Sequence, residues 1–152
     1  MIVIEHSIEI NSTAEKVYAC LLDIFGSSEN YHSWHPDHRD IRWIRGKPFE
    51  NGSIGYAEQY LHGELHRGKF ICTNVVPNSY IEYRPVFPAS IFIPKLQFIF
   101  EMKDNDACIF TARNYLRAGP LFAKLAKQQI ADTKRHISEE GENLKAMVEG
   151  QK

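Results

Sequence analysis

The chain has 152 residues, the usual size of one domain, and 43% of them are hydrophobic, enough to build a core. Its formal net charge of −1 removes the general electrostatic basis for binding nucleic acid. No apolar run reaches the roughly 18 residues that a membrane-spanning helix needs. We therefore expect a single domain, residues 1–152, with neither a nucleic-acid partner nor a membrane span.

The cysteines and the first residues indicate the compartment. Cys20, Cys72 and Cys108 are scattered and form no CxxC pair, which argues against a disulfide framework. The start of the chain lacks the basic segment and the small-residue cleavage site of a signal peptide. We therefore expect a cytoplasmic protein whose cysteines are small buried hydrophobes.

The N-terminal quarter predicts a strand followed by a helix. Residues 2–10 alternate with isoleucine on one side, as a half-buried strand does. Thr13 is an expected N-cap, and helical spacing then continues to about residue 25. Gly26 breaks the pattern, so residues 29–40 are expected to form a loop or a short second helix.

The middle of the chain predicts antiparallel strands joined by turns. We expect them over residues 41–45, 53–61, 64–76, 80–84, 95–102 and 107–117. The apolar segment 85–94 is bounded by prolines and is expected to be a lid over a cavity or a contact in a homodimer. Residues 121–148 predict one long helix, in which Gly141 costs up to roughly 1 kcal/mol.

This order of elements indicates an α+β fold, because a long helix after a run of hairpins must cover one face of the sheet. The segment Ile8-Glu-Ile-Asn-Ser-Thr-Ala-Glu-Lys-Val-Tyr18, the strand start Gly52-Ser-Ile-Gly55 and the closing helix resemble the START/Bet v 1-like superfamily (SRPBCC, polyketide cyclase/dehydrase-like). The resemblance implies a helix-grip fold, in which a curved antiparallel sheet wraps the C-terminal helix around a central cavity. It also implies a small hydrophobic or aromatic ligand, and some members are enzymes.

Glu58 is the most unusual residue of the predicted strands. Alternation puts it on one face with Ile54, Tyr56 and Tyr60, and that composition predicts an inward face. A lone buried carboxylate costs several kcal/mol unless it is paired, protonated or bound to a cation. A cation and an inward Arg113 are the two partners that we consider.

A second candidate group lies on the C-terminal helix. His136 and Glu140 are four residues apart, about one turn, and so project from one face. The segment 34–38, Trp-His-Pro-Asp-His, leads into the sheet and offers His38, with His35 as the alternative. Two histidines and two carboxylates suit zinc, and also iron or manganese. The pair could instead be an exposed ion pair, and the loop histidines could have no ligand role.

The set His38, Glu58, His136 and Glu140 resembles the zinc site of the 2,4-diacetylphloroglucinol and phloretin hydrolases in order and in element. That resemblance implies hydrolytic cleavage of a carbon–carbon bond between an acyl group and a phenolic ring. This chain is shorter than those hydrolases, and its loop histidine is closer in sequence to the strand glutamate. The match therefore supports a metal site more than it supports that substrate.

Two functions follow as expectations. The first is a metal-dependent hydrolase or polyketide cyclase-like enzyme acting on a hydrophobic or aromatic carbonyl compound, and the second is a non-catalytic carrier of a lipid or hydrophobic ligand. The expected proton donors near the substrate are Tyr56, Tyr60 and His62. The expected pocket lining is Trp34, His35, Phe98, Phe100, Gln129 and Thr133.

Overall fold

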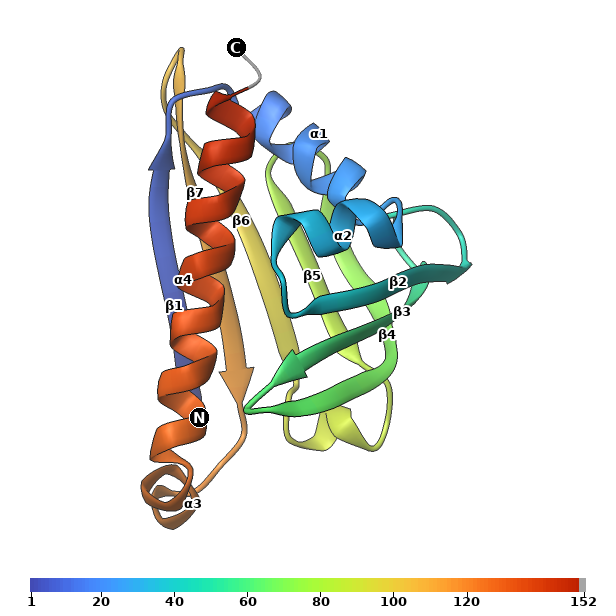
Figure 1. The fold of residues 1–152 in the computed structure, drawn as a ribbon, viewed down its shortest axis with the longest axis vertical. Coiled ribbons are helices and arrows are strands. Elements are labelled where there is room, and N and C mark those ends of the chain that lie inside the picture. Colours follow the sequence, from blue (N-terminus) through green and yellow to red (C-terminus); the bar gives the residue numbers. More distant parts are fainter. Residues whose placement is uncertain (151–152) are drawn as a thin grey trace.

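The computed structural model describes residues 1–150, apart from the side chain of Leu125. One sheet of seven antiparallel strands, in the order β1-β7-β6-β5-β4-β3-β2, forms the body of the molecule (Figure 1). The elements are β1 (Ile2–Ile10), α1 (Ala14–Ile24), α2 (Ser28–Trp34), β2 (His38–Arg45), β3 (Ile54–Leu61), β4 (Glu64–Val76), β5 (Tyr80–Pro85), the 3₁₀ turn η1 (Ala89–Ile91), β6 (Lys95–Asp104), β7 (Ala107–Leu116), α3 (Pro120–Leu125) and α4 (Lys127–Glu149).

The long helix and the sheet enclose the core. Helix α4 runs along β1 and β7, and the β2–β4 half of the sheet turns away from it, with α1 and α2 covering the upper part (Figure 1). No helix within residues 1–150 combines the length and the apolar content needed to cross a membrane. This arrangement brings α2, the start of β2 and the middle of α4 together, although they are about 100 residues apart in sequence.

The first two helices begin at hydroxyl N-caps, whereas the C-terminal helix differs from the expectation. Thr13 accepts a hydrogen bond from the amide of Lys16 and begins α1, as expected. Ser27 begins α2 in the same way, through the amide of Asn30. The single helix expected over residues 121–148 is instead two helices, because the chain leaves the helical path at Ala126.

Aromatic side chains fill the concave side of the sheet. Phe98 and Phe100 of β6 are both buried there, on the face that alternation predicts. Neighbouring rings meet mostly edge-on, the favourable geometry for aromatic pairs. The rings in mutual contact are Tyr18, Phe25, Tyr31, Trp34, Trp43, Phe49, Phe70, Tyr83, Phe98, Phe100 and Phe110.

The predicted inward face of β3 is wrong. Gly55 and Ala57 face the core, because Gly55 lies directly under the buried ring of Phe70. Alternation then places Tyr56 and Glu58 on the outer face, where the guanidinium of Arg42 lies over the Tyr56 ring at 4.5 Å. The rule that large residues face inward fails here because the neighbouring strands fill the core with their own aromatic rings.

Replacing Gly55 by valine should destabilise the fold by about 1–3 kcal/mol. A Cβ at that position would lie 2.3 Å from Cζ of Phe70, whose ring is held edge-on between Trp43 and Tyr83. Urea unfolding followed by tryptophan fluorescence measures the loss. Gly68→Val on β4, where a Cβ meets nothing within 4 Å, is the matched control and should change stability by less than about 0.5 kcal/mol. Equal losses in the two variants would contradict this packing.

Candidate metal centre

Trp34 fixes the segment that carries the early histidines. Its buried indole donates a hydrogen bond from Nε1 to the carbonyl of Glu140 at 2.9 Å. Its own carbonyl accepts a hydrogen bond from Nδ2 of Asn143 at 2.8 Å. Both contacts are to α4, so the loop after α2 is held against the middle of that helix. Trp34 therefore positions the site from behind and is not part of an open pocket lining.

The orientation of His38 determines which of its nitrogens faces the centre. Nδ1 lies 3.1 Å from the carbonyl of Tyr31, which can only accept, so Nδ1 carries a proton. The imidazole also stacks on the Tyr31 ring, with centroids 4.1 Å apart and planes 7° apart. In the neutral ring Nε2 then has a free lone pair, and it lies 2.7 Å from Oε2 of Glu140.

Three lone-pair atoms converge at this point. Nε2 of His136 lies 3.3 Å from Nε2 of His38 and 3.2 Å from Oε2 of Glu140. Two ligand atoms that each bind a tetrahedral zinc at about 2.0–2.1 Å are about 3.3 Å apart, so the 3.2 and 3.3 Å separations suit a shared cation. The 2.7 Å between Nε2 of His38 and Oε2 of Glu140 is shorter than this and has the length of a charge-assisted hydrogen bond. The same atoms could share protons instead, as an imidazolium beside a carboxylate.

The charges of this group are strongly coupled. Burial alone would raise the pKa of the Glu140 carboxyl, but hydrogen bonds from His136 and His38 lower it to about 2. Burial alone would lower the pKa of His136, but the hydrogen bond and the charge of Glu140 raise it above the ordinary value. A negative Glu140 therefore attracts positive charge, whether a proton or a metal ion carries it.

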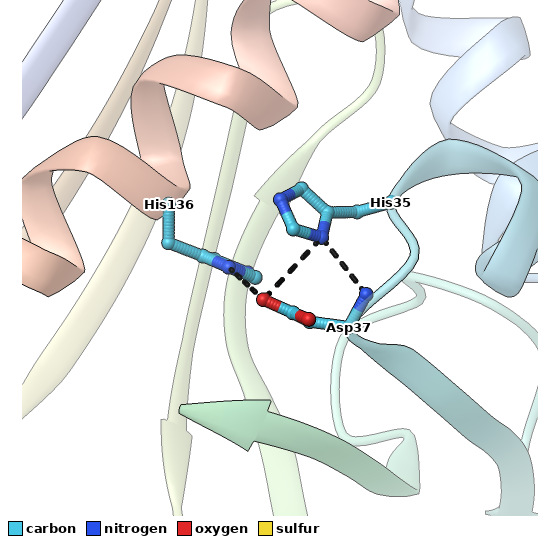
Figure 2. A group of neighbouring side chains, drawn as sticks. All are labelled: His35, Asp37 and His136. Carbon is cyan, nitrogen blue, oxygen red and sulfur yellow. Dashed lines mark hydrogen bonds and ion pairs between the residues drawn. The ribbon is translucent and has the colours of Figure 1, made fainter. Parts of the chain in front are cut away.

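A second group of side chains continues the centre toward solvent (Figure 2). Nδ1 of His35 accepts a hydrogen bond from the amide of Asp37 at 3.0 Å. The Asp37 carboxylate, half exposed, lies 3.9 Å from Nδ1 of His136 and from Nδ1 of His35. Nε2 of His35 lies 3.3 Å from the carboxylate of Glu139. Burial, followed by the charge of His136, lowers the pKa of His35 below its ordinary value, which favours the neutral ring.

The structure thus brings together three of the four predicted metal ligands, His38, His136 and Glu140. Glu58 is not among them, because it lies on the outer face of β3, beside Asp40 and opposite Arg67. The other partner considered for Glu58, Arg113, pairs with Glu5 on β1 instead.

The predicted proton donors lie away from the centre. Tyr56 is on the outer face, and the Tyr60 hydroxyl, also outward, accepts a hydrogen bond from Nη1 of Arg39. His62 occupies the β3–β4 turn with φ of 57° and pairs with Asp132 at 3.4 Å. The inward alternation that motivated all three assignments is therefore not the one that β3 adopts.

The predicted pocket lining is divided between core and surface. Phe98 and Phe100 are packed in the aromatic core, His35 belongs to the centre, and Gln129 is exposed. Thr133 uses its hydroxyl to donate a hydrogen bond to the carbonyl of Gln129. Two surface hollows stand out, one beside Asn11 and residues 104–107 and one between the end of α1, the turn into α2 and residues 47–50, and neither is lined by a residue of the histidine cluster.

Three groups that contact the histidines of the centre were not predicted from the sequence. They are the Tyr31 carbonyl and the carboxylates of Asp37 and Glu139. Asp37 was detectable in principle, because it lies between the two loop histidines, two residues after His35 and one before His38. Glu139 precedes the predicted ligand Glu140 and reaches His35 from the adjacent position on the helix. The role of Tyr31 depends on a backbone atom, so no side-chain pattern reports it.

No protein-family model matches the chain, and no curated protein matches its sequence. Among solved structures, the Zhui aromatase/cyclase from Streptomyces sp. R1128 superposes with a TM-score of 0.73 at 16% identity, covering 97% of this chain and 93% of its own. Norcoclaurine synthase from Thalictrum flavum, in complex with dopamine and hydroxybenzaldehyde, gives 0.74 at 14% identity, covering 99% and 88%. The chain has the helix-grip fold. This confirms the expected fold class, and at such identities the likeness extends no further than the fold.

The stabilising effect of Glu140 should depend on pH in the chelator-treated protein. Its lowered pKa stabilises the fold above the ordinary value of 4.5, and this contribution is lost as the pH falls toward 2. The raised pKa of His136 stabilises the fold below 6.5, and this contribution is lost as the pH rises further. Glu140→Gln should therefore cost most, about 3–5 kcal/mol, between pH 4.5 and 6.5.

Urea unfolding of both proteins at pH 3, 5.5 and 8 measures the difference. Glu142→Gln, an exposed carboxylate on the same helix, is the control and should show no such maximum. A cost of Glu140→Gln that is the same at all three pH values would contradict the coupling of Glu140 to His136.

Proposed function

We propose that this protein binds one divalent cation, zinc foremost, through His38, His136 and Glu140. We propose further that it uses this ion to hydrolyse or cyclise a small hydrophobic or aromatic carbonyl compound. The observation that carries the proposal is the mutual approach of three lone-pair atoms within 3.3 Å, all from buried or nearly buried side chains. Lone pairs repel one another unless a cation or a proton lies between them.

The surroundings of His38 favour a metal ion over a shared proton. Metal-binding histidines almost always donate their other N–H to a carbonyl or carboxylate, which fixes the tautomer. The Tyr31 carbonyl does this for His38. The carboxylate of Asp37 lies on the Nδ1 side of His136 but at 3.9 Å, too far for a direct hydrogen bond, so this support comes from His38 alone.

The number of ligands supports a catalytic centre over a structural one. Structural zinc sites are closed by four protein ligands, whereas catalytic sites have three and leave a position for water or substrate. Glu58, which was predicted as the fourth ligand, lies on the outer face, and this removes the four-ligand site on which the enzymatic prediction was based. The proposal therefore depends on the three side chains that do meet within the described residues.

The residues around the centre have separate roles in this proposal. A divalent ion held here would lower the pKa of bound water and polarise a carbonyl oxygen. Asp37, half exposed and 3.9 Å from His136, would take the proton from the attacking water as general base. His35, held by the Asp37 amide and by Glu139, would keep that carboxylate in place.

The substrate class is the most specific part of the proposal. The two solved structures named above are an aromatase/cyclase and a synthase with two aromatic compounds bound. The ligand pattern His38, His136 and Glu140 also resembles part of the acylphenol hydrolase site. Together these favour an aromatic carbonyl compound, with cleavage of an acyl group from a phenolic ring as the reaction to test.

The purified protein should contain close to one equivalent of a divalent metal. His38→Ala and His136→Ala should each remove it, because loss of one of three ligands leaves too few donors. Glu58→Gln should retain it, since Glu58 lies outside the group. Inductively coupled plasma mass spectrometry after dialysis measures the content, and His66→Ala, an exposed histidine, is the control.

A protein that takes up no metal even after incubation with zinc would overturn the proposal. The second candidate, a non-catalytic carrier of a hydrophobic ligand, would then stand. It has one specific support: no buried side-chain nitrogen or oxygen in the described part of the chain lacks a hydrogen-bond partner, so protons alone could satisfy the centre. A carrier would bind an apolar dye equally well with and without a chelator.

Asp37→Asn should lower the turnover of acylphenols, in which the acyl group is bonded to a ring carbon, by about 10²–10⁴-fold. The reason is that the side-chain amide cannot accept the proton from water. Its metal content should stay at the wild-type level if the ion binds to His38, His136 and Glu140, and should fall if the ion binds to the neighbouring group His35, Asp37 and His136. Release of the free acid from a panel of acylphenols, measured by chromatography, is the assay. Asp40→Asn, at the outer face of β2, is the control, and equal activity of Asp37→Asn and wild type would exclude the general-base role.

A further inference from the structure

The β5–β6 loop and α3 lie at the same end of the molecule (Figure 1), and both carry exposed apolar side chains. The segment that leads into α3 is joined to the loop, because the amide of Arg117 donates a hydrogen bond to the carbonyl of Phe92 at 2.7 Å. We call this surface the apolar tip. Its apolar members are Val86, Phe87, Ile91, Phe92, Leu121 and Phe122.

The exposure of these side chains is large for their type. Phe87 is 75% exposed, Phe92 64%, Leu121 72% and Phe122 57%. Single exposed hydrophobic residues are common on protein surfaces, but several that are large and adjacent indicate an interaction site. The proposed metal centre does not involve any of them, so this surface needs an explanation of its own.

The chain segments that carry the apolar tip contain basic residues and no acidic ones. The sequence contains no aspartate or glutamate between residues 83 and 100 or between residues 107 and 131, although the chain as a whole has 19. Within the described residues, no carboxylate lies within ion-pairing distance of Arg84, Arg117, Lys124 or Lys127. The acidic residue that follows these segments, Asp132, already pairs with His62 and Arg135.

We propose that the apolar tip docks on the surface of an anionic lipid bilayer. Exposed aromatic and aliphatic side chains enter the boundary between headgroups and acyl chains, and flanking Lys and Arg bind anionic headgroups. The four basic residues named above flank the apolar side chains in sequence, and Arg117 also contacts the loop through its amide. Since no helix of residues 1–150 is able to cross a membrane, the contact is peripheral.

A bilayer fits this surface better than a folded protein partner does. The apolar side chains belong to a loop with one 3₁₀ turn and to the short helix α3, so they do not form one face of a single long helix or sheet. A protein partner would have to provide a shaped apolar pocket and a ring of carboxylates at once. A fluid anionic bilayer provides both without a matching shape. The inference does not depend on the proposed metal centre.

Sedimentation with sucrose-loaded vesicles tests the proposal. The protein should bind vesicles of phosphatidylcholine with 30% phosphatidylglycerol at least about tenfold more tightly than pure phosphatidylcholine vesicles. Raising the salt from low to about 1 M should remove most of this preference, since the Debye length falls to roughly 3 Å. Equal binding to both vesicle types, or none to either, would overturn it.

Paired variants locate the contact. The double variant Phe87→Ser with Phe92→Ser should weaken vesicle binding at least about tenfold. The control is Ile44→Ser with Val76→Ser, two exposed apolar residues outside the apolar tip, 54% and 49% exposed, and it should bind vesicles as the wild type does. Near-wild-type unfolding transitions show that the variants are folded.

Charge reversal gives a second, independent pair. Lys124→Glu with Lys127→Glu should abolish the preference for anionic vesicles, and Lys16→Glu with Lys47→Glu, an equal change of net charge, should leave it unchanged. Concentration-dependent dimerisation that the Phe87/Phe92 double variant removes, without vesicle binding, would assign the apolar tip to a second copy of the chain and reject the lipid proposal.

Discussion

A carboxylate enclosed with two imidazoles is the constraint on which the site depends. Glu140 is ionised because His38 and His136 both direct ring nitrogens at one of its oxygens. Removing any one member leaves the others buried without compensation, which is a far larger penalty than the loss of a surface ion pair. The surrounding elements, α2, the start of β2 and the middle of α4, are therefore fixed relative to one another by electrostatics as well as by packing.

The sequence was sufficient for the fold and for most of the centre. Alternation over residues 2–10, the Thr13 cap and the long C-terminal helix gave the right elements, since each is a local signal. His136 and Glu140 are also local, because one helical turn places them together whatever the rest of the chain does. His38 followed from its place next to the first strand after the loop.

The predictions were wrong where contacts with other strands determine which face of a strand is buried. Alternation says that Tyr56 and Glu58 share a face, but not which face that is. The answer depends on Phe70, whose ring packs against Trp43 and occupies the space over Gly55, so that a small residue of β3 must face inward there. A pattern of side chains also cannot report the break at Ala126 or the contact between His38 and the Tyr31 carbonyl.

That break gives the last helical segment two separate parts. The amide of Ala126 ends the hydrogen bonding of α3 at Phe122, and its carbonyl begins that of α4 at Ile130. The exposed apolar residues Leu121 and Phe122 therefore belong to a helix of their own, while His136 and Glu140 belong to α4. More than two helical turns separate His136 from the break, so the two surfaces share no residue.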